Sequence, residues 1–152
     1  MRLHREHVDE SRLIDHLRRL MAEGSDGGFL TVTCGPDYWM QFVKNKTNYI
    51  RHSEAPLPPH LFWNAVSNDT LPASRELADL QIAQVRMLGF VYPCDPHPIY
   101  GMYATGFVRI IDQFTPATIP TIAQTSCYLF STVYNSPPPA RLQFELELRG
   151  FR

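Results

Sequence analysis

The chain has 152 residues, a formal net charge of -1 and a sequence pI near 6.6. A domain of this length buries a core without help from disulfides or metal, so we expect a single domain over residues 1–152. The nearly neutral charge provides no strong attraction for nucleic acid or for an anionic membrane surface. We therefore expect neither of them as a partner.

The cysteines and the N-terminal segment of the sequence indicate the cellular compartment of the protein. Cys34, Cys94 and Cys127 are odd in number and widely spaced, which favours thiols in a reducing environment over a disulfide framework. The charged segment Met1–Glu6 is not followed by an apolar signal core, and no apolar stretch is long enough to span a membrane. These features predict a cytoplasmic protein.

The first elements along the chain are a helix and a hairpin. From about Val8 to Glu23 apolar residues recur at helical spacing, and Gly24 follows, which predicts an amphipathic helix with a glycine stop. Phe29–Thr33 and Tyr38–Val43 are rich in β-branched and aromatic residues, and Gly35–Asp37 separates them. This order predicts two antiparallel strands joined by a turn.

A further strand and a second helix are predicted in the middle of the chain. Leu61–Asn68 has strand character, whereas the proline-rich Ala55–Pro59 before it cannot pair as a central strand. The helix is expected to open at Ser74, whose hydroxyl can cap the first turn, and to end at Gly89. The apolar pattern of this helix consists of Leu77, Leu80, Ala83 and Met87.

The next segments predict a loop, short strands and a third helix. Tyr92–Pro98 contains three prolines and predicts a loop, and Ile99–Ile111 predicts one or two short strands. The third helix covers Thr115–Tyr134, where Pro120 is acceptable only within the first turn, and Asn135–Pro139 ends it. Its apolar face consists of Ile119, Ile122, Ala123, Leu129, Phe130 and Val133.

The last element is predicted from alternation. Leu142–Leu148 alternates strictly between apolar and polar residues, which predicts a late edge strand or an arm that seeks a partner. We expect Glu145 and Glu147 to face one way, and the apolar residues not to lie all on one face. The order of elements predicts an α+β domain in which helices flank a twisted antiparallel β-sheet.

Catalytic and metal chemistry has one candidate. Cys94 and His97, in Cys-Asp-Pro-His, have the spacing of half a zinc site, but a structural zinc needs four ligands and no second pair exists. The other ligands would come singly from His52, His60, Cys34 and Cys127. A cysteine nucleophile, Cys34, Cys94 or Cys127, with one of the six histidines is a further alternative, although the sequence does not show any such pair within hydrogen-bond reach. We expect no metal, no cofactor and no catalysis; a small enzyme or zinc protein that uses Cys94 and His97 stays as an alternative.

Aromatic residues make up 12% of the chain. Trp39, Phe42, Phe62 and Trp63 lie on adjacent predicted strands. Most aromatic side chains fill a core, but several on one exposed face would form the contiguous apolar patch that marks a partner site.

Several segments of the chain together resemble a known family. They are Tyr38–Phe42 (YWMQF), Ala65–Pro72 (AVSNDTLP), Leu88–Pro93 (LGFVYP) and the helix end Val133–Tyr134. In this order, over roughly two thirds of the chain, they are similar to the type III secretion chaperone-like and YbjN-like group of small peptide-binding chaperones, the TY-chaperones. The chain departs from the family pattern at the insertion Asn48–His60 and at Asn64, where an acidic residue is expected.

The resemblance implies a function. TY-chaperones place a curved sheet between helices, frequently form homodimers and bind client proteins without catalysis, so the chain is expected to hold a client protein or peptide of a bacterial secretion or conflict system. The positions carried over as client-binding residues are Trp39, Phe42, Trp63, Val66 and Leu71. An immunity or accessory protein of a toxin or defence system, with one cognate partner, is the alternative on the same scaffold.

Overall fold

The computed structural model describes residues 2–45, 59–91, 106–135 and 141–149. The strands are β1 (Phe29–Cys34), β2 (Tyr38–Lys44), β3 (Leu61–Ala65), β4 (Phe107–Ile111) and β5 (Leu142–Glu147). The α-helices are α1 (Arg2–Glu23), α2 (Asp79–Met87) and α3 (Ile119–Tyr128). The strands form one antiparallel sheet in the order β4-β3-β2-β1-β5, which confirms the predicted α+β class.

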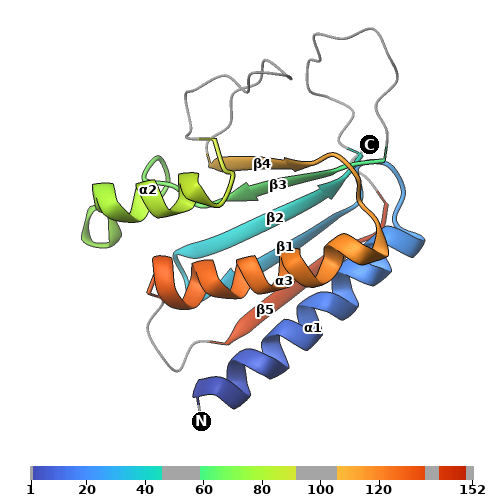
Figure 1. Ribbon diagram of the computed structural model, residues 1–152, viewed down its shortest axis with the longest axis horizontal. Helices are drawn as coiled ribbons and strands as arrows, with labels where there is room; N and C mark the ends of the chain where they lie inside the picture. The colour runs from blue at the N-terminus through green and yellow to red at the C-terminus, as the bar shows by residue number, and fades with distance from the viewer. Residues whose placement is uncertain (1, 46–58, 92–105, 136–140, 150–152) are drawn as a thin grey trace, which may run out of the picture.

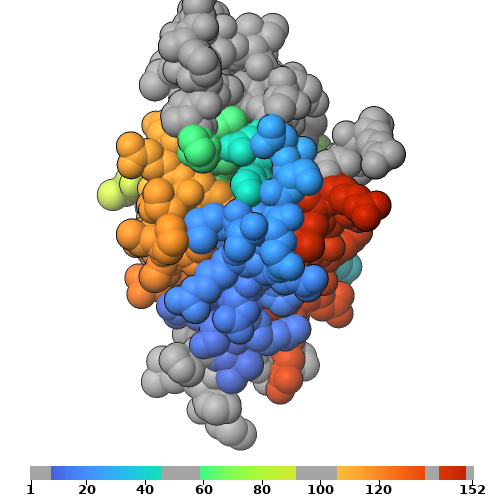
Figure 2. Space-filling view, turned by 90° about the vertical axis from the view of Figure 1, so that its right-hand side faces the viewer, coloured from blue at the N-terminus to red at the C-terminus, as the bar shows by residue number. Residues whose placement is uncertain are grey.

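The helices form a layer on one face of this sheet (Figure 1). In β2 the alternate residues Tyr38, Met40 and Phe42 are buried beneath this layer, where they belong to the same apolar cluster as Leu13 and Leu17 of α1. Figure 2 shows the blue surface of α1 beside the red surface of β5, the edge strand that α1 contacts. None of the helices in the described ranges is both long and apolar enough to cross a membrane.

The predicted first helix and hairpin are confirmed. The helix α1 ends at Glu23, before the predicted glycine, although it begins at Arg2 rather than near Val8. The strands β1 and β2 pair with Val32 opposite Met40, and Gly35 between them has a φ of 71°. A turn residue with this φ is favoured to be glycine. Because glycine marks such a turn in the sequence, the hairpin could be predicted from local sequence.

The second helix differs from its prediction. The strand before it, β3, ends at Ala65, and α2 begins at Asp79 rather than at Ser74, which lies in a separate 3-10 turn, Ala73–Arg75. The side chain of Asn68 accepts a hydrogen bond from the Leu77 N–H at 2.7 Å and donates one to the Leu77 carbonyl at 3.1 Å. Because these bonds engage both backbone groups of Leu77, the helix starts only after this residue.

The third helix keeps its predicted buried face but changes its geometry. A 3-10 turn, Pro116–Thr118, precedes α3, and Pro120 lies in the first turn as predicted. After Tyr128 the chain continues as a π-helical turn, Leu129–Val133. The predicted apolar face is buried throughout: Ile119, Ile122, Ala123, Leu129, Phe130 and Val133.

The last strand, β5, is an edge strand that pairs with β1 of the same chain, with Phe144 opposite Val32. Contrary to our expectation, Leu142, Phe144 and Leu146 all lie on the helix-covered face, because side chains in a strand alternate with a period of two. His16 of α1 stacks on Phe144, with ring centres 4.4 Å apart. The strand is therefore anchored within the chain.

Several predicted segments lie outside the described residues. They are residues 55–58 of the proline-rich segment, the loop Tyr92–Pro98 with Cys94 and His97, and His52. Of Ile99–Ile111, the described part contains one strand, β4.

Candidate binding surface on the helical layer

Exposed apolar side chains gather on the helices. Among the described residues, the large apolar side chains that are exposed are Val8 of α1, Leu80 and Met87 of α2, and Tyr128 of α3. The exposure is 72% for Leu80 and 86% for Met87. A single exposed apolar residue is ordinary on a protein surface, but two on one helix require an explanation.

Leu80, Ala83 and Met87 form a stripe along α2, which we call the α2 stripe. Their spacing of three and four residues places them on one side of the helix, and all three are exposed. Val85 faces the core and is fully buried. The Gln81 side chain donates a hydrogen bond to the Val133 carbonyl at 2.7 Å and so ties α2 to the π-helical turn. The α2 stripe is therefore held in a defined orientation.

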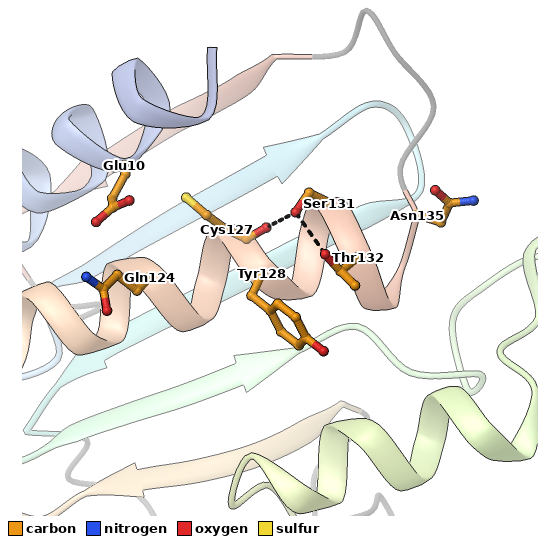
Figure 3. Close-up of a pocket in the computed structure, with 7 residues that line it drawn as sticks. All are labelled: Glu10, Gln124, Cys127, Tyr128, Ser131, Thr132 and Asn135. Carbon is orange, nitrogen blue, oxygen red and sulfur yellow. Dashed lines mark hydrogen bonds between the residues drawn. The ribbon is translucent and has the colours of Figure 1, made fainter. Parts of the chain in front are cut away.

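An open groove of about 690 Å³ lies along α3 beside α1. Its lining residues are Glu10, Gln124, Cys127, Tyr128, Ser131, Thr132 and Asn135. Figure 3 shows Cys127 pointing toward α1, whereas Tyr128 points toward α2. The π-helical turn supplies Ser131 and Thr132, and such turns are frequent at functional sites.

The groove carries hydrogen-bonding groups together with the Cys127 thiol. The Ser131 hydroxyl donates to the Cys127 carbonyl at 2.8 Å, so its proton is engaged within the helix. Among the described residues that line the groove there is no histidine, the most common general base in proteins. Within the described ranges, no group of three or more His, Cys, Asp or Glu residues could hold a metal ion.

The five residues carried over as client-binding do not form one exposed surface. Phe42, Trp63 and Val66 are fully buried, and Leu71 is 9% exposed. Trp39 is half-buried and alternates with the core residues of β2, so it lies on the sheet face opposite the helices. In this structure four of the five belong to the core, where a client does not reach them.

The segment after β3 is fixed by a buried phenol. The Tyr134 hydroxyl donates a hydrogen bond to the Val66 carbonyl at 2.8 Å, and the Tyr134 ring stacks on Tyr38 with centres 5.4 Å apart. Burial raises the pKa of Tyr134 well above its ordinary value, and Tyr38 adds to the effect. The neutral phenol therefore serves as a permanent donor, and Val66 has a structural role.

No protein-family model, no curated protein and no solved structure matches this chain. The function therefore has to be inferred from the residues of the chain itself.

Proposed function

We propose that this chain is a non-enzymatic protein-binding module, a chaperone or adaptor of the TY-chaperone kind, that holds an apolar segment of a client protein on the α2 stripe. The observation that carries the proposal is the exposure of Leu80 and Met87 on one side of a helix whose other side is anchored in the core. An exposed apolar surface of this kind is typical of a partner site.

The energetics favour a client with apolar side chains. Burying a leucine or methionine side chain contributes about 1.5–3 kcal/mol, so Leu80 and Met87 together would contribute about 3–6 kcal/mol before the cost of association. Methionine adapts its shape to different partners, which suits a surface that binds client segments. The small side chain of Ala83 between them allows the client to approach the helix closely.

The resemblance to TY-chaperones supports a particular kind of client protein and the formation of a homodimer. TY-chaperones act on proteins of bacterial secretion or conflict systems and frequently form homodimers, and we extend both properties to this chain as part of the proposal. The groove along α3 supplies neighbouring carboxylate, amide and hydroxyl groups for polar contacts. In this proposal the α2 stripe supplies the apolar contacts, and the groove on α3 and α1 supplies polar ones.

The test is capture of a client by the full chain. Tagged protein is purified from its native host, and stoichiometric partners are identified by mass spectrometry. The double variant Leu80→Gln/Met87→Gln removes the apolar stripe, whereas Val8→Gln makes the same kind of change on α1. We expect the client to bind the natural chain and Val8→Gln, and to be lost from the double variant.

Folding of all three proteins is checked by circular dichroism and thermal unfolding. If a client binds the folded double variant as well as the natural chain, the α2 stripe is not the client site and the proposal is wrong. No partner with any of the three proteins also counts against a client-binding module.

A further inference from the structure

Arg109 of β4 lies just beyond the C-terminal end of α2. Its guanidinium carbon is 5.8 Å from the ring centre of Trp63, the residue opposite it in the sheet. Gly89, with a φ of 93°, follows the helix, and a Cβ at this position would lie 3.3 Å from the Arg109 Nε. The guanidinium is therefore held between an indole ring and the backbone at a helix C-terminus, where the helix dipole favours a cation.

The described residues leave the hydrogen-bonding capacity of the Arg109 guanidinium unused. Within the described ranges, Arg109 forms no ion pair and no side-chain hydrogen bond, although its side chain is half-buried. Burial lowers the pKa of Arg109, because water is partly excluded from the charged group. The buried indole N–H of Trp63 also has no acceptor in the described part of the chain. Buried donors in native proteins normally have partners, and the described residues supply none for these two groups.

We infer that Arg109 binds a carboxylate of the client segment that lies on the α2 stripe. The inference rests on the proposed function, because Met87, the end of the stripe, lies only two residues before Gly89. Leu80 and Met87 are about 10 Å apart along the helix. The client would therefore carry apolar side chains over this length, followed by an acidic side chain or by its own C-terminal carboxylate.

The chemistry of the guanidinium selects this ligand. Its planar set of N–H groups matches the two oxygens of a carboxylate, and the guanidinium carbon lies 5.8 Å from the ring centre of Trp63. In a partly desolvated position, a charge-assisted hydrogen bond is stronger than one between neutral groups. The apolar stripe would then supply affinity, while Arg109 would set the direction and end point of the bound segment.

The inference is tested with small probes and does not require the client. The ¹⁵N-labelled full chain is titrated at constant ionic strength with N-acetyl-leucine, with N-acetyl-leucinamide and with N-acetyl-aspartate amide. The resonances followed are the Trp63 indole N–H and the Arg109 Nε–H, and the Trp39 indole on the opposite face of the sheet is the internal control. We expect a saturable shift at Trp63 and Arg109 with at least one of the two carboxylates, and none with N-acetyl-leucinamide.

The two carboxylates distinguish a chain terminus from an acidic side chain. Arg109→Gln should abolish the Trp63 shift, and Arg109→Lys, which keeps the charge but loses the planar fork, should weaken binding about tenfold. Arg75→Gln, which removes an exposed arginine elsewhere, should bind as the natural chain does. Absence of a shift with both carboxylates, an equal shift with N-acetyl-leucinamide, or a shift that survives Arg109→Gln would each overturn the inference.

Failure of this inference can be separated from failure of the proposed function. If Leu80→Gln/Met87→Gln loses the client while carboxylates leave Trp63 unchanged, only the role of Arg109 is wrong. If carboxylates bind at Arg109 while the double variant keeps its client, Arg109 is a carboxylate-binding site, but the α2 stripe is not the client site.

Discussion

The aromatic cluster beneath the helices and the α2 stripe have similar side chains but opposite environments. In the cluster, Trp63 packs against Phe42 and Phe90, with ring centres 5.2 and 4.8 Å apart, and is fully buried. On the stripe, Leu80 and Met87 are mostly exposed. Apolar surface that is buried on folding stabilises the fold, whereas apolar surface that stays exposed is available for a partner. The two regions should therefore respond oppositely to substitution.

The largest expected effect is on the buried side of this comparison. Trp63→Ala removes the largest fully buried side chain and leaves a cavity, so the free energy of unfolding should fall by about 3–5 kcal/mol. Urea unfolding followed by circular dichroism measures it. A loss below about 1 kcal/mol would mean that the cluster is not the core of the fold.

A smaller loss is expected at Tyr134. Tyr134→Phe keeps the ring but leaves the buried Val66 carbonyl without its donor, which should cost about 1–3 kcal/mol at neutral pH. Equal stability of the two proteins would show that this hydrogen bond contributes nothing net.

The ionisation of Tyr134 should also make the stability of the fold depend on pH. Since burial raises the pKa of Tyr134 in the folded state, the phenol ionises first in the unfolded state, above a pH of about 10. Its stabilising contribution is complete below that pH and is lost as the pH rises further. Unfolding measured from pH 8 to 11 should therefore show a fall in stability that Tyr134→Phe reduces. An identical slope in both proteins would contradict the assignment.

An intermediate loss of stability is expected at Asn68, which lies between β3 and α2. Asn68→Ala removes both side-chain bonds to Leu77, so the start of α2 should loosen at a cost of about 1–2 kcal/mol. Hydrogen exchange of the Leu77 and Ala78 amides measures this local effect, with the amides of β1 as the control. Faster exchange throughout the sheet would indicate a global rather than a local role.

The smallest effect on stability is expected on the exposed side. Leu80→Gln/Met87→Gln changes side chains that are mostly in water, so the free energy of unfolding should stay within about 0.5 kcal/mol for each substitution. Urea unfolding measures this change as for Trp63→Ala. A loss of several kcal/mol would place these side chains in the core and remove the contrast on which the proposed site depends.

Local sequence was sufficient for most elements of the fold. The helix before Gly24, the hairpin at Gly35 and the position of Pro120 in α3 were all predicted, because glycine and proline restrict the backbone locally. The alternation in Leu142–Leu148 likewise predicted an edge strand. These predictions require no knowledge of distant contacts.

Tertiary structure decided which apolar residues are buried. Around α2 the sequence contains two overlapping apolar sets, one with Leu80, Ala83 and Met87 and another with Ile82, Val85 and Leu88, and both have helical spacing. Periodicity identified the first set together with Leu77, and the core takes Leu77 and the second set. The start of the helix likewise depends on Asn68, nine residues before Leu77.

The same limit applies to the two tryptophans of the strands. Trp39 and Trp63 were equivalent in sequence, because a strand pattern defines two faces without showing which one the helices cover. Trp63 is fully buried on the face that the helices cover, whereas Trp39, which alternates with the core residues of β2, is only half-buried. Burial is a property of the assembled layers, since it depends on surfaces from segments far apart in the chain, whereas local backbone conformation depends mainly on neighbouring residues.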